Sequence, residues 1–284
     1  MGAELKVMYA QADLEDRQVS PELYTREYYR HVQGYQDWDA THGRRLPPRL
    51  ARAVRLARIR PGQRCLDVGT GRGEVVFHAA MAGAEAVGID YSDSSLDIAR
   101  EALGSYPDEV RKRCTFAAMD SRKLVYEDAH FDRIFMLDLV EHLYPEGLAQ
   151  TLAEAHRVLK PGGLLIVHTE PNRNYATLAV RAFESRHLGP LVRPLTRALT
   201  GSTVPFSPYR QAMHVNEQSP DSLGAVLKEA GFRARVWCSG IYGVEELREW
   251  RSVLKRVALS GWPVTAIGPL AKTFGINVWA VAER

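Results

Sequence analysis

The chain has 284 residues, of which 45% are hydrophobic and 25% are charged, and its formal net charge is +3. These are the proportions of an ordinary globular protein, and they exclude a disordered, collagen-like or fibrous chain. The three cysteines lie far apart and match neither a disulfide framework nor a CxxC metal knuckle, which favours a reducing cytoplasm.

The sequence predicts neither export nor membrane insertion. Its first residues lack the apolar stretch of a signal peptide and include early acidic residues. The uncharged stretch 257–271 is interrupted by prolines and glycines and is shorter than the about 20 residues that a spanning helix needs. We therefore expect a cytoplasmic protein without a transmembrane segment, and the sequence predicts no particular oligomeric state.

Residues 1–46 are polar but rich in aromatic side chains, namely Tyr24, Tyr28, Tyr29, Tyr35 and Trp38. Two interpretations stay open for them: packing on the core, or an N-terminal lid segment that closes over a ligand. A helix is expected to begin at Pro47–Pro48 and to end before Pro61. Its arginines recur every three residues, which is typical of a solvated helix face and argues against a nucleic-acid surface. These are Arg49, Arg52, Arg55 and Arg58.

Short apolar runs then alternate with helical patterns. Strands are expected at 64–69, 85–90, 114–120, 131–138, 163–170, 233–240 and 275–283. Helices are expected at 74–83, 92–103, 145–159 and 219–232, with Ser92 or Asp93 and Ser219 as caps and a turn at 160–163. This alternation predicts an α/β protein with a Rossmann-like, doubly wound, mostly parallel sheet. Residues 47–284 would form this domain, with lid insertions at about 171–214 and 241–274.

A glycine-rich loop joins the first predicted strand to its helix. Gly69, Gly71 and Gly73 allow a tight turn at a helix N-terminus, and Asp90 ends the next strand, where an acid can bind a ribose diol. The spacing is GxGxG rather than the dinucleotide GxGxxG, and Glu74 would repel a pyrophosphate. The loop therefore favours an adenosine ligand without phosphate, whose cationic amino group Asp67 could face.

The run Leu66-Asp67-Val68-Gly69-Thr70-Gly71-Arg72-Gly73 resembles the first motif of class I S-adenosylmethionine (SAM)-dependent methyltransferases. Further motifs over residues 47–170 resemble the same family, in the branch that includes quinone-biosynthesis methyltransferases. The resemblance implies seven strands with the last one antiparallel, and SAM as co-substrate. It implies that Asp90 holds the ribose with Tyr91 following it, that Asp120 meets the adenine amine, and that Asp138 lies beside the methionine moiety. Tyr29 is expected to cover the cofactor, because aromatic rings attract a sulfonium.

The stretch Asp138-Leu139-Val140-Glu141-His142 leaves a central strand at the edge where such sheets bind ligands. Three interpretations stay open for it. His142 could be a general base, since the unperturbed pKa of histidine suits proton removal near neutrality. Asp138, Glu141 and His142 could instead form a Mg²⁺ or Mn²⁺ site, completed by His168 or His214, because Asp-x-x-Glu-His resembles the metal cluster of two methyltransferase branches. In the third, Glu141 and His142 only cap a helix, and no metal is the main expectation.

His168 follows the next strand toward the same edge and is a second candidate base. The acceptor is expected to be a small molecule methylated on oxygen, and an aromatic, glycosidic or lipid-linked one would suit the apolar and basic stretch 244–272, which also suggests peripheral membrane contact. No nucleic-acid partner is expected. A SAM-binding protein without transfer activity and a nicotinamide-dependent oxidoreductase are the alternatives.

Overall fold

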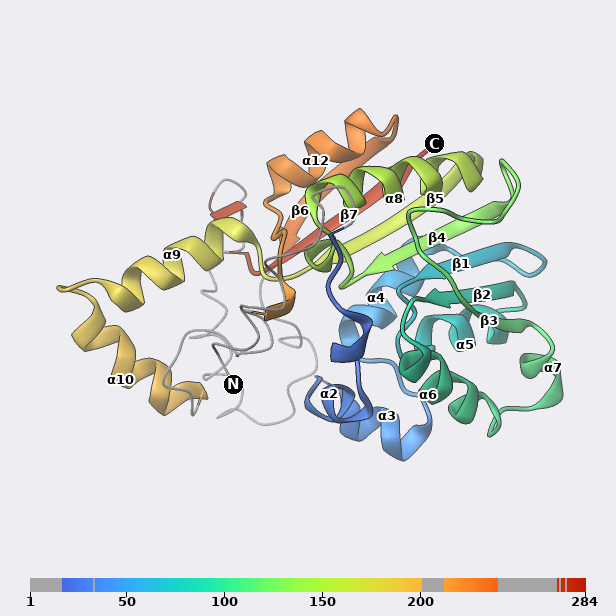
Figure 1. Ribbon diagram of the computed structural model, residues 1–284, viewed down its shortest axis with the longest axis horizontal. Helices are drawn as coiled ribbons and strands as arrows, with labels where there is room; N and C mark the ends of the chain where they lie inside the picture. Colours follow the sequence, from blue (N-terminus) through green and yellow to red (C-terminus); the bar gives the residue numbers. More distant parts are fainter. Residues whose placement is uncertain (1–16, 33, 201–211, 240–269, 271, 274) are drawn as a thin grey trace.

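The computed structural model describes residues 17–32, 34–200, 212–239, 270, 272–273 and 275–284. Its centre is a seven-stranded sheet with the order β3-β2-β1-β4-β5-β7-β6 (Figure 1). The strands are β1 (Arg64–Val68), β2 (Glu85–Asp90), β3 (Cys114–Ala118), β4 (Phe131–Leu137), β5 (Leu159–Thr169), β6 (Arg233–Ser239) and β7 (Asn277–Glu283). β7 is antiparallel to both of its neighbours. The Rossmann-like sheet with an antiparallel last strand is thereby confirmed.

Helices cover both faces of this sheet. On one face lie α4 (Pro48–Ala57), α5 (Glu74–Met81) and α6 (Asp93–Leu103), and on the other α8 (Pro145–Val158) and α12 (Pro220–Glu229) (Figure 1). The Ser92 and Ser219 side chains accept hydrogen bonds from backbone N–H groups in the first turns of α6 and α12, as expected of N-caps. Two short elements were not predicted: α7 (Asp108–Arg111) and the 3-10 helix η3 (Val140–His142).

The core follows from the two-residue period of the central strands. Ile134 and Leu165 pack in the cluster that contains α8 and α12, whereas the next residues, Phe135 and Ile166, pack with α4 and α5. Because both faces are covered, these strands are apolar at consecutive positions. The burial fixes strand register and so places the carboxyl ends of β1, β2 and β4 at one edge.

The N-terminal segment forms a third cluster beside α5 and α6. It contains the 3-10 helix η2 (Pro21–Leu23), α2 (Arg26–His31) and α3 (Tyr35–Thr41). Tyr24, Tyr29 and Trp38 are each at most 9% exposed and share this cluster with Phe77 and Ile98. The aromatic residues of the segment therefore pack on the domain and also reach the carboxyl edge of the sheet.

Two expectations about local structure were wrong. The residues Lys160–Gly163 do not separate helix from strand, because β5 already begins at Leu159 and the register against β4 shifts between Phe131 and Arg133. The arginine face of α4 is also not uniformly solvated. Arg49 forms an ion pair with Asp138, and the Arg52 guanidinium lies over the Trp279 ring, because this face of the helix meets the sheet. Arg55 and Arg58 are exposed as expected.

After β5 the chain forms a helical hairpin of α9 (Arg173–Glu184) and α10 (Gly189–Thr200), which extends away from the sheet (Figure 1). The predicted insertion at 171–214 thus begins as two helices. Most of the second one, at 241–274, lies outside the described residues, and so do residues 201–211 of the first.

Candidate active site

The glycine loop begins directly after β1 and ends where α5 starts. Gly69, Gly71 and Gly73 all have positive φ, between +52° and +83°. A Cβ on Gly73 would lie 2.9 Å from the rings of Phe77 and Phe116, so this position needs glycine for packing as well as for its backbone. The loop can therefore approach both the helix and a ligand closely.

Asp90, at the end of β2, organises this loop. Its carboxylate accepts hydrogen bonds from the backbone N–H groups of Gly71 and Ser92, both at 3.0 Å. Burial raises the pKa of Asp90, and these backbone donors act in the opposite direction by favouring the ionised form. The parallel register sets Val68 beside Ile89, so the loop and the carboxylate emerge next to each other.

Asp67 is a buried carboxyl group without a cationic partner among the described residues. The Thr70 hydroxyl donates to it at 2.8 Å. Burial raises the pKa of Asp67 to about 7, which the Thr70 hydrogen bond only partly opposes. A carboxyl in this state is stabilised in its ionised form by an incoming cation. The site therefore suits an ammonium or sulfonium group.

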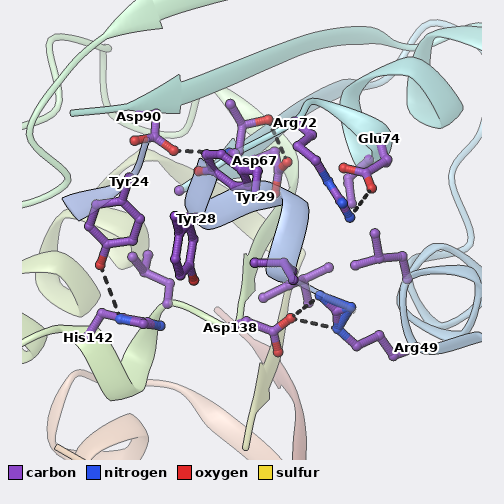
Figure 2. A pocket seen from close by; sticks show the side chains of 18 residues that line it. Tyr24, Tyr28, Tyr29, Arg49, Asp67, Arg72, Glu74, Asp90, Asp138 and His142 are labelled. Carbon is purple, nitrogen blue, oxygen red and sulfur yellow. Dashed lines mark hydrogen bonds and ion pairs between the residues drawn. The ribbon is translucent and has the colours of Figure 1, made fainter. Parts of the chain in front are cut away.

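Two adjoining cavities lie at this edge of the sheet. The larger lies between the glycine loop, α2, α4 and the end of β4 (Figure 2). The smaller lies beside Met119, Asp120 and Tyr144. Four residues line both: Gly69, Asp90, Leu139 and His142. An elongated ligand could thus extend from one cavity to the other past Asp90.

Asp120 lies in the wall of the smaller cavity. Arg122 binds both of its carboxylate oxygens, and Gln18 from the N-terminal segment donates to one of them at 3.3 Å. Tyr91 also lines this cavity, and its hydroxyl donates to the Val19 carbonyl at 2.7 Å. Residues expected to contact an adenine therefore also hold the N-terminal segment.

Tyrosines of the N-terminal segment form the roof of the larger cavity. The Tyr29 hydroxyl lies 2.7 Å from Ser95 Oγ and close to the backbone of Gly71. Tyr24 and Tyr28 line the same cavity, and the Tyr24 hydroxyl points at the His142 ring (Figure 2). The segment is thereby tied to the glycine loop at one end and to η3 at the other.

Asp138 closes the opposite side of the larger cavity. It has a positive φ of 55°, and its carboxylate binds Arg49 at 2.6 Å and His168 Nδ1. Burial opposes ionisation, but Arg49 and His168 outweigh it and hold the pKa of Asp138 below its ordinary value. Asp138 is therefore an anion that is already paired within the protein.

His168 is 1% exposed and lies behind Asp138 rather than in the lining of either cavity. Its second ring nitrogen, Nε2, is 3.1 Å from the Asn277 side-chain oxygen. Both nitrogens thus face protein oxygens. This geometry gives His168 no acceptor-facing nitrogen, in contrast to its expected place as a base.

His142 lines both cavities and is buried. Burial and the neighbouring His214 lower its pKa to about 3, while Asp138 acts in the opposite direction. The ring is therefore neutral at neutral pH. Its Nδ1 lies 3.1 Å from the Tyr24 hydroxyl, and the backbone of Met213 hydrogen-bonds the ring as well.

The proposed metal-binding residues are arranged differently from the expectation. Ligand atoms of Glu141, His142 and His214 lie within 4.8 Å of one another, so His214 is the further ligand that joins the group, and Asp138 is not part of it. Glu141 accepts a hydrogen bond from the Thr169 hydroxyl at 2.7 Å. Burial, followed by the charge of Asp138, raises the pKa of Glu141 well above its ordinary value, so the carboxyl is favoured in its protonated form.

Comparison with known proteins relates this site to a reaction. A family model described as a methyltransferase domain matches residues 65–163. The chain is 30% identical over 190 residues to demethylmenaquinone methyltransferase of Thermus thermophilus, an alignment that covers 65% of this chain and 80% of that protein. The chain belongs to the SAM-dependent methyltransferases. The nicotinamide-dependent alternative is therefore not supported.

Other methyltransferases match over shorter stretches or in fold alone. The 27-O-demethylrifamycin SV methyltransferase of Amycolatopsis mediterranei is 36% identical over 122 residues, which cover 43% of this chain and less than half, 42%, of that protein. A putative methyltransferase from Haloferax volcanii, solved in complex with its Trm112 activator, superimposes with a TM-score of 0.56 at 15% identity. It covers 94% of this chain and 98% of its own.

SAM is the methyl donor of this enzyme family, and the donor set described above fits it. The carboxyl of Asp67, which has no cationic partner in the described part of the chain, suits its cationic end, and Asp90 presents a carboxylate beside a loop whose three glycines have positive φ. Arg72, within the glycine loop, also neutralises the nearby Glu74. Glu74 is buried and paired with Arg72 at 2.8 Å, so it does not project an unpaired charge as its sequence position suggested.

Several residues of the methyltransferase site were not identified from the sequence. Arg49 looked like a surface arginine, Arg122 and Ser95 carried no distinguishing signal, and Thr70 was given no role beyond its place in the first motif. Tyr24 was noted as one of several aromatic residues, but nothing linked it to His142, which lies 118 positions away.

No helix in the described part of the chain is long and apolar enough to cross a membrane.

Proposed function

We propose that this methyltransferase methylates an oxygen atom of a small-molecule acceptor held in the larger cavity. The observation that carries the proposal is the pairing of His142 Nδ1 with a hydroxyl group, that of Tyr24, at 3.1 Å in the cavity wall. An imidazole positioned to meet one hydroxyl can meet that of an acceptor in its place. Relatives named for O-methylation, such as the rifamycin enzyme, support the same choice.

The cofactor would lie across both cavities. We assign Asp90 to the ribose hydroxyls, Asp67 to the amino group and Asp120 to the adenine amine, because each carboxylate lines the corresponding part of the connected space. The backbone of the loop at Gly69, Gly71 and Gly73 would lie directly against the ligand. Tyr91 would border the adenosine, Tyr29 would cover the methionine part, and Asp138 would bound it from β4. When bound, SAM supplies the electrophilic methyl carbon.

His142 is proposed as the group that takes the acceptor proton. In the tautomer with its proton on Nε2, the neutral ring offers Nδ1 as a hydrogen-bond acceptor. Its pKa of about 3 keeps the ring unprotonated at neutral pH, and it also makes His142 a weaker base than the unperturbed histidine expected from the sequence. The nearby Asp138 anion favours the imidazolium once the proton has arrived, since its charge acts to raise the pKa of His142.

His168 is proposed as a positioning residue rather than a base. Together with Arg49 it fixes the Asp138 carboxylate at the end of β4, and Asn277 fixes His168 in turn. The Asp138 charge is thereby oriented at the cavity wall before the reaction and need not rearrange during it. We further propose that residues 1–46 and the insertions at about 171–214 and 241–274 act as lids over the acceptor.

The acceptor class is proposed to be aromatic, glycosidic or lipid-linked. The larger cavity is lined by three tyrosines together with Val32, Leu50 and Leu137, so it can hold a ring or an aliphatic skeleton. An activated carbon acceptor would need no base. Substitution of His142 should therefore slow methylation of an oxygen acceptor but not methylation of a carbon acceptor, so the substitution distinguishes the two.

The test uses radiolabelled SAM with paired acceptors, one member of each pair with free hydroxyls and the other with none: a quinol and its dimethyl ether, and a phenolic glycoside and its permethylated analogue. We expect label transfer only to the hydroxyl-bearing member. His142→Gln should reduce kcat by about 10²-fold or more, the usual contribution of a general base, and change the dissociation constant for S-adenosylhomocysteine (SAH) less than threefold. The control is His156→Gln, which changes a histidine on α8 outside both cavities.

Transfer to the dimethyl ether would contradict oxygen methylation, because neither of its oxygens carries a proton to remove. Full activity of His142→Gln with a hydroxyl acceptor would contradict the base assignment alone. Absence of SAH binding to the wild-type protein would contradict the cofactor assignments.

A further inference from the structure

The α9–α10 hairpin carries an unusual concentration of exposed apolar side chains. Leu178, Leu188 and Leu191 are 41%, 53% and 72% exposed. They are three of the six large hydrophobic residues that are exposed in the described part of the chain, although the hairpin is only about a tenth of the sequence. Single exposed leucines are common, but a group of them on one projection marks an interaction surface.

The same hairpin holds the net positive charge of the protein. Residues 173–200 contain five arginines and one acid, Glu184, so their net charge is 5 − 1 = +4. The rest of the chain has 37 − 5 = 32 basic and 34 − 1 = 33 acidic residues, a net charge of −1. Arg181, Arg186 and Arg197 are exposed and have no ion-pair partner among the described residues. Their charges are therefore available to an external anion.

The shape of the hairpin suits contact with a flat surface. Its turn, at Ser185–Leu188, lies at the end farthest from the sheet, and the exposed Leu188 and Leu191 lie at or next to this turn (Figure 1). Arg193 stabilises the hairpin internally, because its Nε donates to the Phe183 carbonyl at 3.0 Å and its guanidinium lies over the Phe183 ring. The surface leucines and arginines are thus held on a pre-formed element.

We propose that the tip of the α9–α10 hairpin docks the enzyme on an anionic lipid bilayer. The leucines would enter the interfacial region while the arginines bind lipid phosphates, the pattern of helices that lie in the membrane interface. A second copy of the chain is a poorer occupant, since a symmetric contact would oppose two surfaces of +4 charge. The hairpin is joined directly to the acceptor edge of the sheet, because α9 starts four residues after the end of β5.

The experiment is cosedimentation of the full-length protein with vesicles of phosphatidylcholine, with and without one-third phosphatidylglycerol. We expect binding to the anionic vesicles only, with loss of binding at high salt. Arg181→Gln/Arg186→Gln/Arg197→Gln should lower the partition coefficient about 10²-fold, because each of the three basic side chains near such a surface contributes roughly fivefold. Leu188→Asp/Leu191→Asp should abolish binding.

Two matched controls separate this surface from general charge and polarity. Arg55→Gln/Arg58→Gln/Arg60→Gln removes the same charge from exposed positions elsewhere, and Val125→Asp adds an acid at a side chain that is 77% exposed. Both should bind like the wild type, and circular dichroism checks that all variants are folded.

Equal loss in the two triple variants would overturn the proposal, because binding would then follow net charge alone. No preference for anionic vesicles would overturn it as well. Concentration-dependent dimers in sedimentation, lost in Leu188→Asp/Leu191→Asp and accompanied by no vesicle binding, would assign the leucines to self-association instead.

Discussion

Asp67 should make cofactor binding depend on pH through one carboxyl group. Its pKa is raised to about 7 by burial, and the Thr70 hydroxyl is its hydrogen-bond donor. If the ammonium group of SAH lies against this carboxyl, binding requires the ionised form. Below pH 7 the affinity should fall about tenfold per pH unit, which amounts to roughly 25-fold between about pH 7.5 and 5.5.

The substitution Asp67→Asn removes the titrating group while preserving its size. Calorimetric titration with SAH at several pH values should give a steep dependence for the wild type and a shallower one for Asp67→Asn. Asp90 and Glu141 remain in both proteins, so the difference between the two slopes isolates Asp67. The same slope in both proteins would refute the assignment of Asp67 to the ammonium group.

The raised pKa of Asp67 also predicts the stability of the ligand-free protein. A carboxyl whose folded-state pKa exceeds its unfolded value favours the folded state at low pH, and this contribution is lost as pH rises through about 7. A shift of about three units corresponds to about 4 kcal/mol in all, of which roughly 2–3 kcal/mol falls between about pH 5 and 8. Urea denaturation should therefore show wild type losing that much more stability than Asp67→Asn over this interval, and parallel curves would contradict it.

The remaining predictions concern single contacts. Asp90→Ala should weaken SAH binding by about 10²-fold, because it removes charge-assisted hydrogen bonds to the ribose and frees the Gly71 N–H, and near-wild-type affinity in calorimetry would sink the ribose assignment. Gly73→Ala should lower the unfolding free energy by roughly 1–3 kcal/mol in urea titration, since its Cβ would meet Phe77 and Phe116 at 2.9 Å; unchanged stability would show that the loop relaxes. Turnover should survive EDTA, because Thr169 and Tyr24 already engage Glu141 and His142, and inactivation reversed by Mg²⁺ or Mn²⁺ would establish the metal interpretation.

The sheet could be predicted from the sequence because its signals are local. Consecutive apolar residues in β4 and β5, the capping serines Ser92 and Ser219, and the loop after β1 each follow from neighbours in the chain. The number of strands and the antiparallel direction of the last one came from the family resemblance, and the structure confirms both, whereas the strand order was not predicted. The prediction of a turn at Lys160–Gly163 was wrong because an irregularity within a strand and a turn that precedes a strand use the same types of residue.

Partners at the candidate site could not be predicted, because they join distant segments through side-chain direction. Periodicity placed Arg49 on the outer face of α4, but it does not report that this helix end meets Asp138. His168 and His142 looked equivalent as histidines that follow central strands. In the structure one faces Asp138 and Asn277 and the other faces Tyr24, and only the packed fold creates that difference.

Two contacts hold elements together across the larger cavity, and their energies differ. The Arg49–Asp138 pair is ionic and mostly buried, and breaking such a pair typically costs about 3–5 kcal/mol because it leaves an uncompensated charge. The Tyr24–His142 contact joins two neutral groups, and a neutral hydrogen bond contributes only about 0.5–1.5 kcal/mol net. An acceptor hydroxyl that takes the place of the Tyr24 hydroxyl forms a new hydrogen bond to His142, which offsets most of the energy lost when the Tyr24 contact breaks. We therefore expect ligands to enter by displacing the N-terminal segment at Tyr24, while α4 stays fixed to Asp138 and keeps the charged wall in place.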